Sequence, residues 1–191
     1  MDKIDFLEWV HMNPKQQRDV VSLLDRVWPS LHLSDAANVA SLHNPSLKPQ
    51  SLRLLRGDEP VAYVAVLSQT VEVAGQSYLA QGLSCVACEP ELQGQGLGSR
   101  VVAEATAWMK NSGADIGIFT CDPELVPFYS RFGWAEVPRL LLYGSLDVGA
   151  INSVDTGKRV MLQLWSTRAK AREVDFGQTK INLGLPIGEF W

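Results

Sequence analysis

The sequence predicts a mixed α/β protein in which helices cover both faces of one mostly antiparallel sheet. Three observations lead to this prediction. An amphipathic pattern follows Asn13-Pro14, a β-rich meander fills residues 60–88, and a glycine-rich turn then opens a second amphipathic stretch. Another strand, a short helix and further strands complete the order. We see no repeat and no interdomain linker, so one domain over residues 1–191 is expected.

Composition agrees with an ordinary globular protein and excludes several other classes. The chain has 191 residues, of which 46% are hydrophobic and 20% charged. A net charge of -4 without any Lys/Arg run argues against nucleic-acid binding. Residues 1–14 are too acidic and polar for a signal peptide, and no apolar run reaches membrane-spanning length. We therefore expect a cytoplasmic protein without nucleic-acid or membrane partners.

The first helix has a clear start and a clear end. Asn13 is a capping residue, and Pro14 stands where its missing N–H costs nothing. Val20, Val21, Leu24, Val27 and Trp28 recur at helical spacing, and Pro29 then stops the pattern. A second, short helix is expected to begin at Ser34-Asp35 and to end near Pro45.

Strands dominate the next part of the chain. Residues 51–57, 60–73 and 78–90 have β-type patterns, and the turn sequences GDEP and AGQS separate them. The last two runs are predicted to form an antiparallel pair.

The second half repeats helices and strands. After the glycine cluster, one apolar helical stripe is formed by Leu97, Val101, Ala105, Trp108 and Met109, and Gly113 follows in the usual C-terminal position. Strands are expected at residues 114–121, 139–146 and 158–165, with a short helix at 123–133. The tail is of mixed character and ends in the apolar sequence LPIGEFW.

Three glycines, Gly94, Gly96 and Gly98, alternate just before the second amphipathic helix. The first turn of a helix has unsatisfied N–H donors and the positive end of the helix dipole. Without side chains, the backbone lets a phosphate approach those donors to hydrogen-bond distance. A Walker loop would need a lysine where Gly98-Ser99-Arg100 stands, and the spacing does not fit a dinucleotide-binding fingerprint.

Two segments resemble motifs of the GNAT superfamily of N-acetyltransferases. Residues Gln93–Gly98 resemble its pyrophosphate loop, Gln/Arg-x-x-Gly-x-Gly/Ala, and residues Phe128–Trp134 resemble its second signature, FY-x-x-x-GF/W. The two motifs have the order and separation of the family. The resemblance implies a GNAT fold, with a V-shaped splay in the sheet, a core at about residues 13–143 and a C-terminal strand and tail at 144–191.

Acetyl-CoA is the cosubstrate that the resemblance implies. The pantetheine arm is expected against the end of the strand before the loop, where a bulge splays two strands, and the diphosphate against the loop itself. The cofactor-binding residues predicted in this way are Val86, Cys88, Gln93, Gly94, Gln95, Gly96, Leu97, Gly98 and Ser99.

Acetyl transfer to an amine needs an oxyanion donor, an acid for the leaving thiolate and a base. Tyr129 occupies the family position of the acid, and Phe128 and Phe132 would keep its phenol protonated. A backbone N–H near Val86 would meet the oxyanion. The amine is expected to attack the thioester directly in a ternary complex.

The tail resembles the aminoglycoside 2'-N-acetyltransferase branch, whose chains end in an acid, an apolar residue and tryptophan. Glu189 and Trp191 match the acceptor contacts of that branch. Its glutamate base is replaced here by Ser84, whose hydroxyl can only position a water. If the tail folds back over the slot, the carboxylate of Trp191, or Glu189, is the substitute base; a frayed end without this role is the alternative. Asp35 would add negative charge to the acceptor pocket or, alternatively, cap a helix.

The three cysteines do not suggest a metal or a disulfide framework. Cys85 and Cys88 lie three apart, so on a strand they would point to opposite faces, and the histidines are scattered. We expect core cysteines and no metal.

The preferred function is transfer of an acetyl group to a small aminoglycoside-like or polyamine-like amine. A protein N-terminus or lysine is the alternative acceptor, and a non-catalytic acyl-CoA-binding module is the alternative class. A homodimer is left open.

Overall fold

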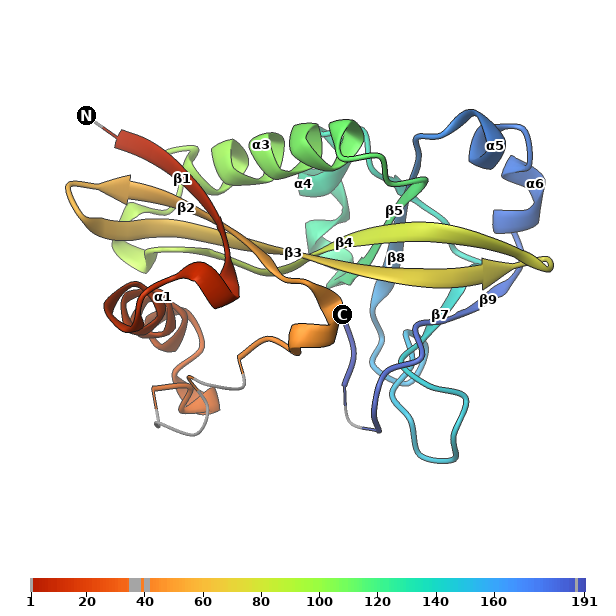
Figure 1. The fold of residues 1–191 in the computed structure, drawn as a ribbon, viewed down its shortest axis with the longest axis horizontal. Helices are drawn as coiled ribbons and strands as arrows, with labels where there is room; N and C mark the ends of the chain where they lie inside the picture. The colour runs from red at the N-terminus through yellow and green to blue at the C-terminus, as the bar shows by residue number, and fades with distance from the viewer. Residues whose placement is uncertain (1, 35–38, 40–41, 188) are drawn as a thin grey trace. The chain divides into compact units, whose positions relative to one another are not determined.

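The chain forms two compact units in the computed structural model, which describes residues 2–34, 39, 42–187 and 189–191 (Figure 1). Unit 1 comprises Met1–Leu67 and Leu83–Ala107, and unit 2 comprises Ser68–Gly82 and Trp108–Trp191. Two long strands and one helix belong partly to each. None of the described helices is both long and apolar enough to cross a membrane.

The regular elements are named as in Figure 1. The strands are β1 (Asp2–Glu8), β2 (Gln50–Arg56), β3 (Glu59–Val73), β4 (Gln76–Cys88), β5 (Ile116–Cys121), β6 (Ala135–Glu136), β7 (Leu141–Tyr143), β8 (Arg159–Leu164) and β9 (Lys180–Asn182). The α-helices are α1 (Pro14–Val27), α3 (Leu97–Asn111), α4 (Val126–Ser130), α5 (Thr167–Lys170) and α6 (Glu173–Phe176). Single turns of 3-10 helix are η1 (Trp9–His11), η2 (Pro29–Leu31), η3 (Pro45–Leu47), η4 (Pro90–Leu92) and η5 (Pro123–Leu125).

Unit 1 is an antiparallel layer with a helix on each side. Its strands follow the order β1-β2-β3-β4. The β1–β2 register runs from Asp2↔Arg56 to Glu8↔Gln50, and β2 continues antiparallel to β3. Helix α1 lies on one side of these strands and α3 on the other (Figure 1). This arrangement buries the apolar stripe of each helix.

Helix α1 confirms the start that the sequence predicts. The Asn13 side chain accepts a hydrogen bond from the Gln16 N–H at 3.0 Å, and the Gln16 side chain accepts one from the Asn13 N–H at 2.9 Å. This reciprocal capping box satisfies two donors of the first turn. The buried face of the helix consists of Val20, Val21, Leu23 and Leu24.

The larger sheet of unit 2 has the strand order β3-β4-β5-β8-β6, in which the described strands β4 and β5 run parallel. Strands β4 and β5 pair at only two positions, Ala80↔Ile116 and Gln81↔Gly117. Strand β5 is antiparallel to β8 over its whole length, and β8 also pairs with the short β6. A separate two-stranded parallel sheet joins β7 and β9. The predicted α/β fold with a mixed, mostly antiparallel sheet is thus confirmed.

Aromatic rings fill the core of unit 2 around β5. The Phe119 ring packs edge-on against Tyr129 at 4.8 Å and against Trp134 at 4.7 Å between centroids. Gly117 makes this packing possible, because a Cβ there would lie 2.5 Å from the rings of Trp134 and Trp165. Glycine weakens a strand interior, so its presence here indicates a close approach of other groups.

Several elements differ from the sequence-based expectation. Strand β1 was not expected, because its half-buried residues show no clean alternation. Strand β7 is shorter than residues 139–146, and α5, α6 and β9 lie where no element was expected, because three or four residues show no periodicity. Asp35 and most of the short helix expected to begin at Ser34-Asp35 lie outside the described residues.

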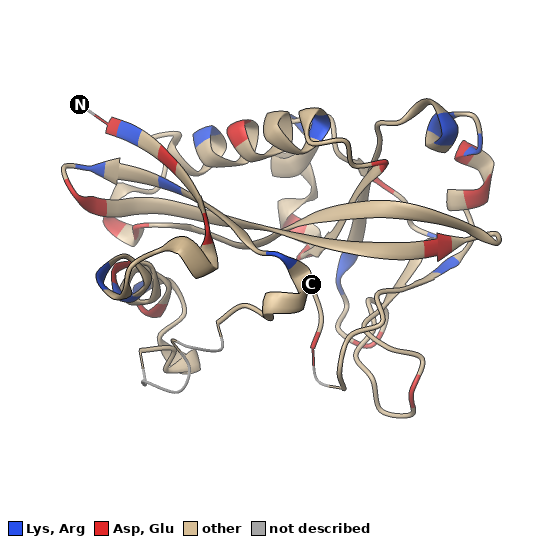
Figure 2. Ribbon diagram, in the orientation of Figure 1, with Lys and Arg blue, Asp and Glu red and all other residues tan. Residues whose placement is uncertain are grey.

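Asp115 links the start of β5 to β4 and to α5 within unit 2 through hydrogen bonds. Its carboxylate accepts hydrogen bonds from the Leu79 N–H at 2.9 Å and from the Arg168 Nε at 2.7 Å, while the Arg168 Nη2 makes a second contact. Arg168 belongs to α5, which is basic, whereas α6 is acidic (Figure 2). The guanidinium hydrogen bonds, opposed by burial and aided by the Leu79 N–H, lower the pKa of Asp115 to about 2.

The lowered pKa predicts how stability depends on pH. The unfolded carboxyl has a pKa of 3.8, so the stabilisation from ionised Asp115 is complete above that value. It is lost as pH falls from about 4 through about 2. Asp115→Asn should lower the free energy of unfolding by about 1–3 kcal/mol at pH 7 and by much less at pH 2.

Urea titrations of both proteins at several pH values measure this difference. Glu72→Gln, at an exposed position of β3, is the control and should change the unfolding free energy little at any pH. If Asp115→Asn lowered the free energy of unfolding equally at pH 7 and pH 2, ionised Asp115 would not be the source of the stabilisation.

Candidate functional site

The turn between β4 and α3 exposes its backbone. Strand β4 ends at Cys88, η4 follows, and residues 93–96 are all exposed. Gly94 and Gly96 both have φ of +80°, in the left-handed region that L side chains rarely adopt, and a Cβ at either would meet no atom within 4 Å. The helix begins at once, since the Arg100 N–H donates to the Gly96 carbonyl at 3.0 Å. An open loop therefore leads directly into a helix N-terminus.

Two contacts within unit 1 hold this loop in place. The Glu89 N–H donates to the Val61 carbonyl at 2.9 Å, and the Glu89 carboxylate accepts hydrogen bonds from the Arg26 Nε and Nη2, the shortest at 2.7 Å. On the other side of the turn, Leu97 is 8% exposed and anchors α3 in the core. The loop is thus fixed at both ends while its glycines face open space, which suits recognition by backbone N–H groups.

One amide of the helix start is directed at a sulfur of the same unit. The Gly98 N–H donates a hydrogen bond to the Cys88 side chain. Burial raises the pKa of Cys88, and this hydrogen bond opposes the effect only in part, so the thiol stays neutral at pH 7. Cys85 and Cys88 are half-buried and Cys121 is buried, and all three are free thiols.

Strand β4 is irregular at the position where the resemblance implies a bulge. Cys85 has φ of +50°, which is rare for a residue other than glycine. The neighbouring Ser84 is half-buried, and its hydroxyl donates to the Cys85 sulfur at 3.6 Å. Val86 follows directly, so the backbone near this residue departs from the regular strand pattern.

A buried polar cluster in unit 1 escaped the sequence analysis. The Tyr63 hydroxyl lies 2.7 Å from the His43 Nε2 and 2.9 Å from the Ser51 Oγ. Burial lowers the pKa of His43 to about 4, so the imidazole is neutral at pH 7, and burial raises that of Tyr63. No sequence spacing links these residues, because they come from three separate segments.

Tyr129 is the buried member of the second motif, in unit 2. It is 5% exposed and packs against Phe119 and Phe128, whose ring centroids lie 4.8 and 5.0 Å away. Burial raises the pKa of its phenol, and the nearby Cys121 and Asp122 raise it further. The hydroxyl therefore remains protonated at neutral pH, as an acid requires.

The tail is docked within unit 2 through Trp191. The indole is 6% exposed, and its Nε1–H donates to the Ile118 carbonyl at 3.0 Å. The Thr120 hydroxyl donates to the main-chain oxygen of Trp191 at 3.1 Å. Glu189 is half-buried, and its carbonyl would lie 2.3 Å from a Cβ on Gly144. The tail therefore packs where two glycines leave room, at Gly144 and Gly82.

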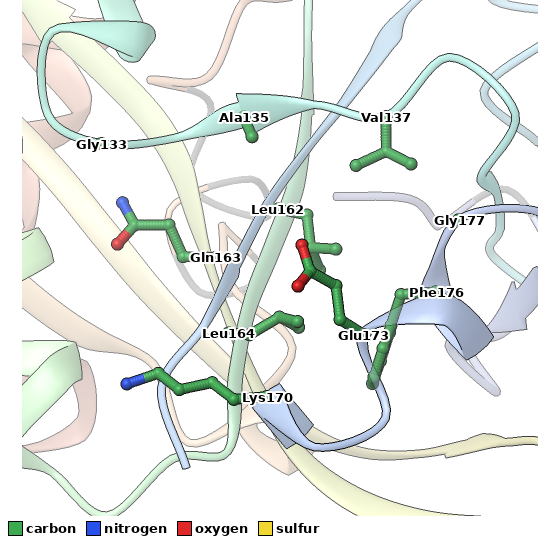
Figure 3. Close-up of a pocket in the computed structure, with 10 residues that line it drawn as sticks. All are labelled: Gly133, Ala135, Val137, Leu162, Gln163, Leu164, Lys170, Glu173, Phe176 and Gly177. Carbon is green, nitrogen blue, oxygen red and sulfur yellow. The ribbon is translucent and has the colours of Figure 1, made fainter. Parts of the chain in front are cut away.

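A cavity of about 410 Å³ lies elsewhere in unit 2 (Figure 3). Apolar side chains from β6, β8 and α6 line it, and the Lys170 side chain extends away from the Glu173 carboxylate. None of the residues predicted for the cofactor or the acceptor lines this cavity.

The structure brings the predicted residues together within each unit. Residues 84–99 form one continuous segment of unit 1, and in unit 2 both Tyr129 and Trp191 contact β5. Asp35 lies outside the described residues. The contacts of Thr120, Ile118 and Gly82 with Trp191 were missed, and Gly82 on a β-rich run was the one available signal.

One protein family matches more than half of this chain. Residues 11–137, more than half of the chain, match the family described as acetyltransferase (GNAT) domain. A search of the curated proteins gave no match.

Solved structures share the fold at low sequence identity. A GNAT family acetyltransferase from Brucella melitensis in complex with acetyl-CoA is 15% identical with a TM-score of 0.60, over 94% of both chains. The Escherichia coli N-acetyltransferase YhbS in complex with CoA is 16% identical with a TM-score of 0.60, over 95% of this chain and 89% of the other. A conserved Enterococcus faecalis protein is 19% identical with a TM-score of 0.58; the match covers 72% of this chain and only 33% of that protein's length.

The family match agrees with the two sequence motifs and with the exposed loop at the start of α3. The chain belongs to the acetyltransferase (GNAT) domain family, whose enzymes are N-acetyltransferases that use acetyl-CoA as cosubstrate.

Proposed function

We propose that this enzyme transfers an acetyl group from acetyl-CoA to a primary amine of a small molecule, aminoglycoside-like or polyamine-like, by direct attack in a ternary complex. The single observation that carries the proposal is the pair of positive-φ glycines in an exposed loop that leads into α3. The loop Gln93–Ser99 would bind the diphosphate through its backbone, and Val86 and Cys88 would contact the pantetheine arm. The cytoplasmic location is part of the same proposal.

Tyr129 is the proposed acid. Its burial keeps the phenol protonated, and a protonated phenol supplies the proton that the leaving thiolate of CoA accepts. The backbone N–H near Val86 is proposed as the oxyanion donor, which the irregular strand at Cys85 would leave available. Ser84 would position a water at most, because burial and the contact with Cys85 supply no charged partner that would turn a hydroxyl into a base.

The acceptor is proposed from the tail and from the charge of the chain. Glu189 is half-buried and carries a carboxylate suited to an ammonium group, and the net charge of -4 favours cationic acceptors. Glu189 and Trp191 also remain the proposed candidates for the base. The aminoglycoside branch stays a prediction, since Ser84 replaces its glutamate.

Gly96→Ala tests the loop. The added Cβ enters the proposed phosphate site and strains a residue at φ of +80°, so the affinity for CoA should fall at least about tenfold. Isothermal calorimetry with CoA measures the change.

Gly57→Ala is a matched control, because Gly57 also has positive φ with no atom within 4 Å of an added Cβ, but lies in the β2–β3 turn. It should lose similar stability, about 1–2 kcal/mol, and bind CoA as the wild type does. Equal CoA affinity for the wild type and both variants would contradict binding of the CoA diphosphate by this loop.

Tyr129→Phe tests the acid. Removing the hydroxyl while keeping the ring should lower kcat about 100-fold, with little change in the KM for acetyl-CoA. Tyr78→Phe is the control, since Tyr78 is also buried in unit 2, against Phe176, and should retain activity. Wild-type kcat in the Tyr129→Phe enzyme would exclude this role.

A thiol-release assay with acetyl-CoA distinguishes the acceptor classes. We expect release with kanamycin-like or polyamine acceptors and little with peptides that offer an N-terminus or a lysine. Faster release with the peptides would favour the alternative acceptor. Tight CoA binding without turnover on any amine would favour a non-catalytic module.

A further inference from the structure

The turn that leads to the proposed diphosphate loop carries an unfavourable charge for an anion site. Residues 88–99 contain two acids, Glu89 and Glu91, and no basic residue, and the next base along the chain is Arg100. A carboxylate close to a diphosphate repels it and weakens its binding. An anion site at this turn therefore needs a compensating cation from another part of the chain.

Arg26, 63 positions before Glu89, supplies such a cation within unit 1. Its Nε donates to the two Glu89 carboxylate oxygens at 3.0 and 2.9 Å, and its Nη2 donates to one of them at 2.7 Å. The Arg26 Nη1 donates to the Ser22 carbonyl of the same helix at 3.1 Å. The guanidinium is thus oriented by α1 on one side and by the carboxylate on the other, in the fork geometry that a lysine cannot reproduce.

Glu89 is the residue through which the turn is attached to the rest of unit 1. Its N–H donates to the Val61 carbonyl of β3 at 2.9 Å, and its carbonyl accepts the Leu92 N–H at 2.9 Å, which closes η4. The loop begins at Gln93, directly after this single turn. The position of Glu89 therefore determines where the loop starts.

The ion pair joins two elements that the strands separate. Helix α1 lies on one side of the strands of unit 1, and the turn leads into α3 on the other side (Figure 1). The side chain of Glu89 is 18% exposed and that of Arg26 is 49% exposed, so water screens the pair only in part. The negative charge of Glu89 is thereby compensated close to the loop.

We propose that Arg26 is a positioning residue for CoA, an inference that rests on the proposed function. Its guanidinium neutralises Glu89 and holds the turn, so the loop presents its backbone to the diphosphate without an uncompensated carboxylate beside it. When Arg26 is removed, Glu89 stays attached to β3 through its backbone, and its charge then opposes the incoming anion. Arg26 in this way raises the affinity for CoA from outside the loop.

Calorimetric titration with CoA tests this role without an acceptor amine. Arg26→Gln should bind CoA at least about fivefold more weakly than the wild type, because the Glu89 charge is no longer compensated. Arg26→Lys should stay within about threefold of the wild type, since its ammonium group still neutralises Glu89. The double variant Arg26→Gln/Glu89→Gln should bind CoA at least about twofold more tightly than Arg26→Gln, because the repelling charge is gone.

Asp25→Asn is the matched control in the same turn of α1. The Asp25 carboxylate accepts hydrogen bonds from the Leu33 N–H at 2.6 Å and the Ser34 N–H at 2.8 Å, so it holds a different segment of unit 1. Its variant should lose stability in urea titrations and keep the wild-type affinity for CoA within about twofold.

Three results would overturn the role of Arg26. They are wild-type affinity in Arg26→Gln, an equal loss of affinity in Asp25→Asn, and a double variant that binds CoA no more tightly than Arg26→Gln. The last two would indicate a general loosening of α1 rather than compensation of Glu89. Failure of CoA to bind the wild type would instead reject the proposed function.

Discussion

The backbone conformation of the turn between β4 and α3 is the constraint on which the functional interpretation depends. Gly94 and Gly96 adopt a conformation that is strained for other residues, and no side chain covers them. The Glu89–Arg26 ion pair and buried Leu97 hold the two ends of the turn, so the open geometry belongs to the folded state rather than to a loose loop. A helix dipole and an exposed backbone at this point favour an anion without any basic side chain.

Strand β5 organises the core of unit 2. Through Phe119 it packs the buried Tyr129, and through Ile118 and Thr120 it binds Trp191. Gly117 in the same strand has no side chain and so leaves room for two tryptophan rings. The Asp115 carboxylate holds the beginning of this strand, so one short segment of six residues contacts both the proposed acid and the docked Trp191.

The sequence predicts those parts that local rules determine. The Asn13 cap of α1 and the spacing of Val20, Val21 and Leu24 follow from neighbouring residues, and the ends of β2 and β8 lie within one residue of the predicted runs. Two of the three loop glycines have the positive φ that an exposed backbone turn implies, while Gly98 lies inside α3. The place where the tail docks could not be predicted, because it depends on Gly82 and Gly144, which lie 109 and 47 positions from Trp191. The same holds for the contact between His43 and Tyr63, which only the fold brings together.

An NMR titration of protein labelled with ¹⁵N-glycine tests the central claim most directly. Added CoA should shift the amide signals of Gly94, Gly96 and Gly98 most, and phosphate-free pantetheine should leave them nearly unchanged, because the diphosphate makes the contact. The signal of Gly57 serves as the internal reference. Large shifts confined to other glycines, or equal effects of CoA and pantetheine on the loop, would contradict diphosphate recognition by this backbone.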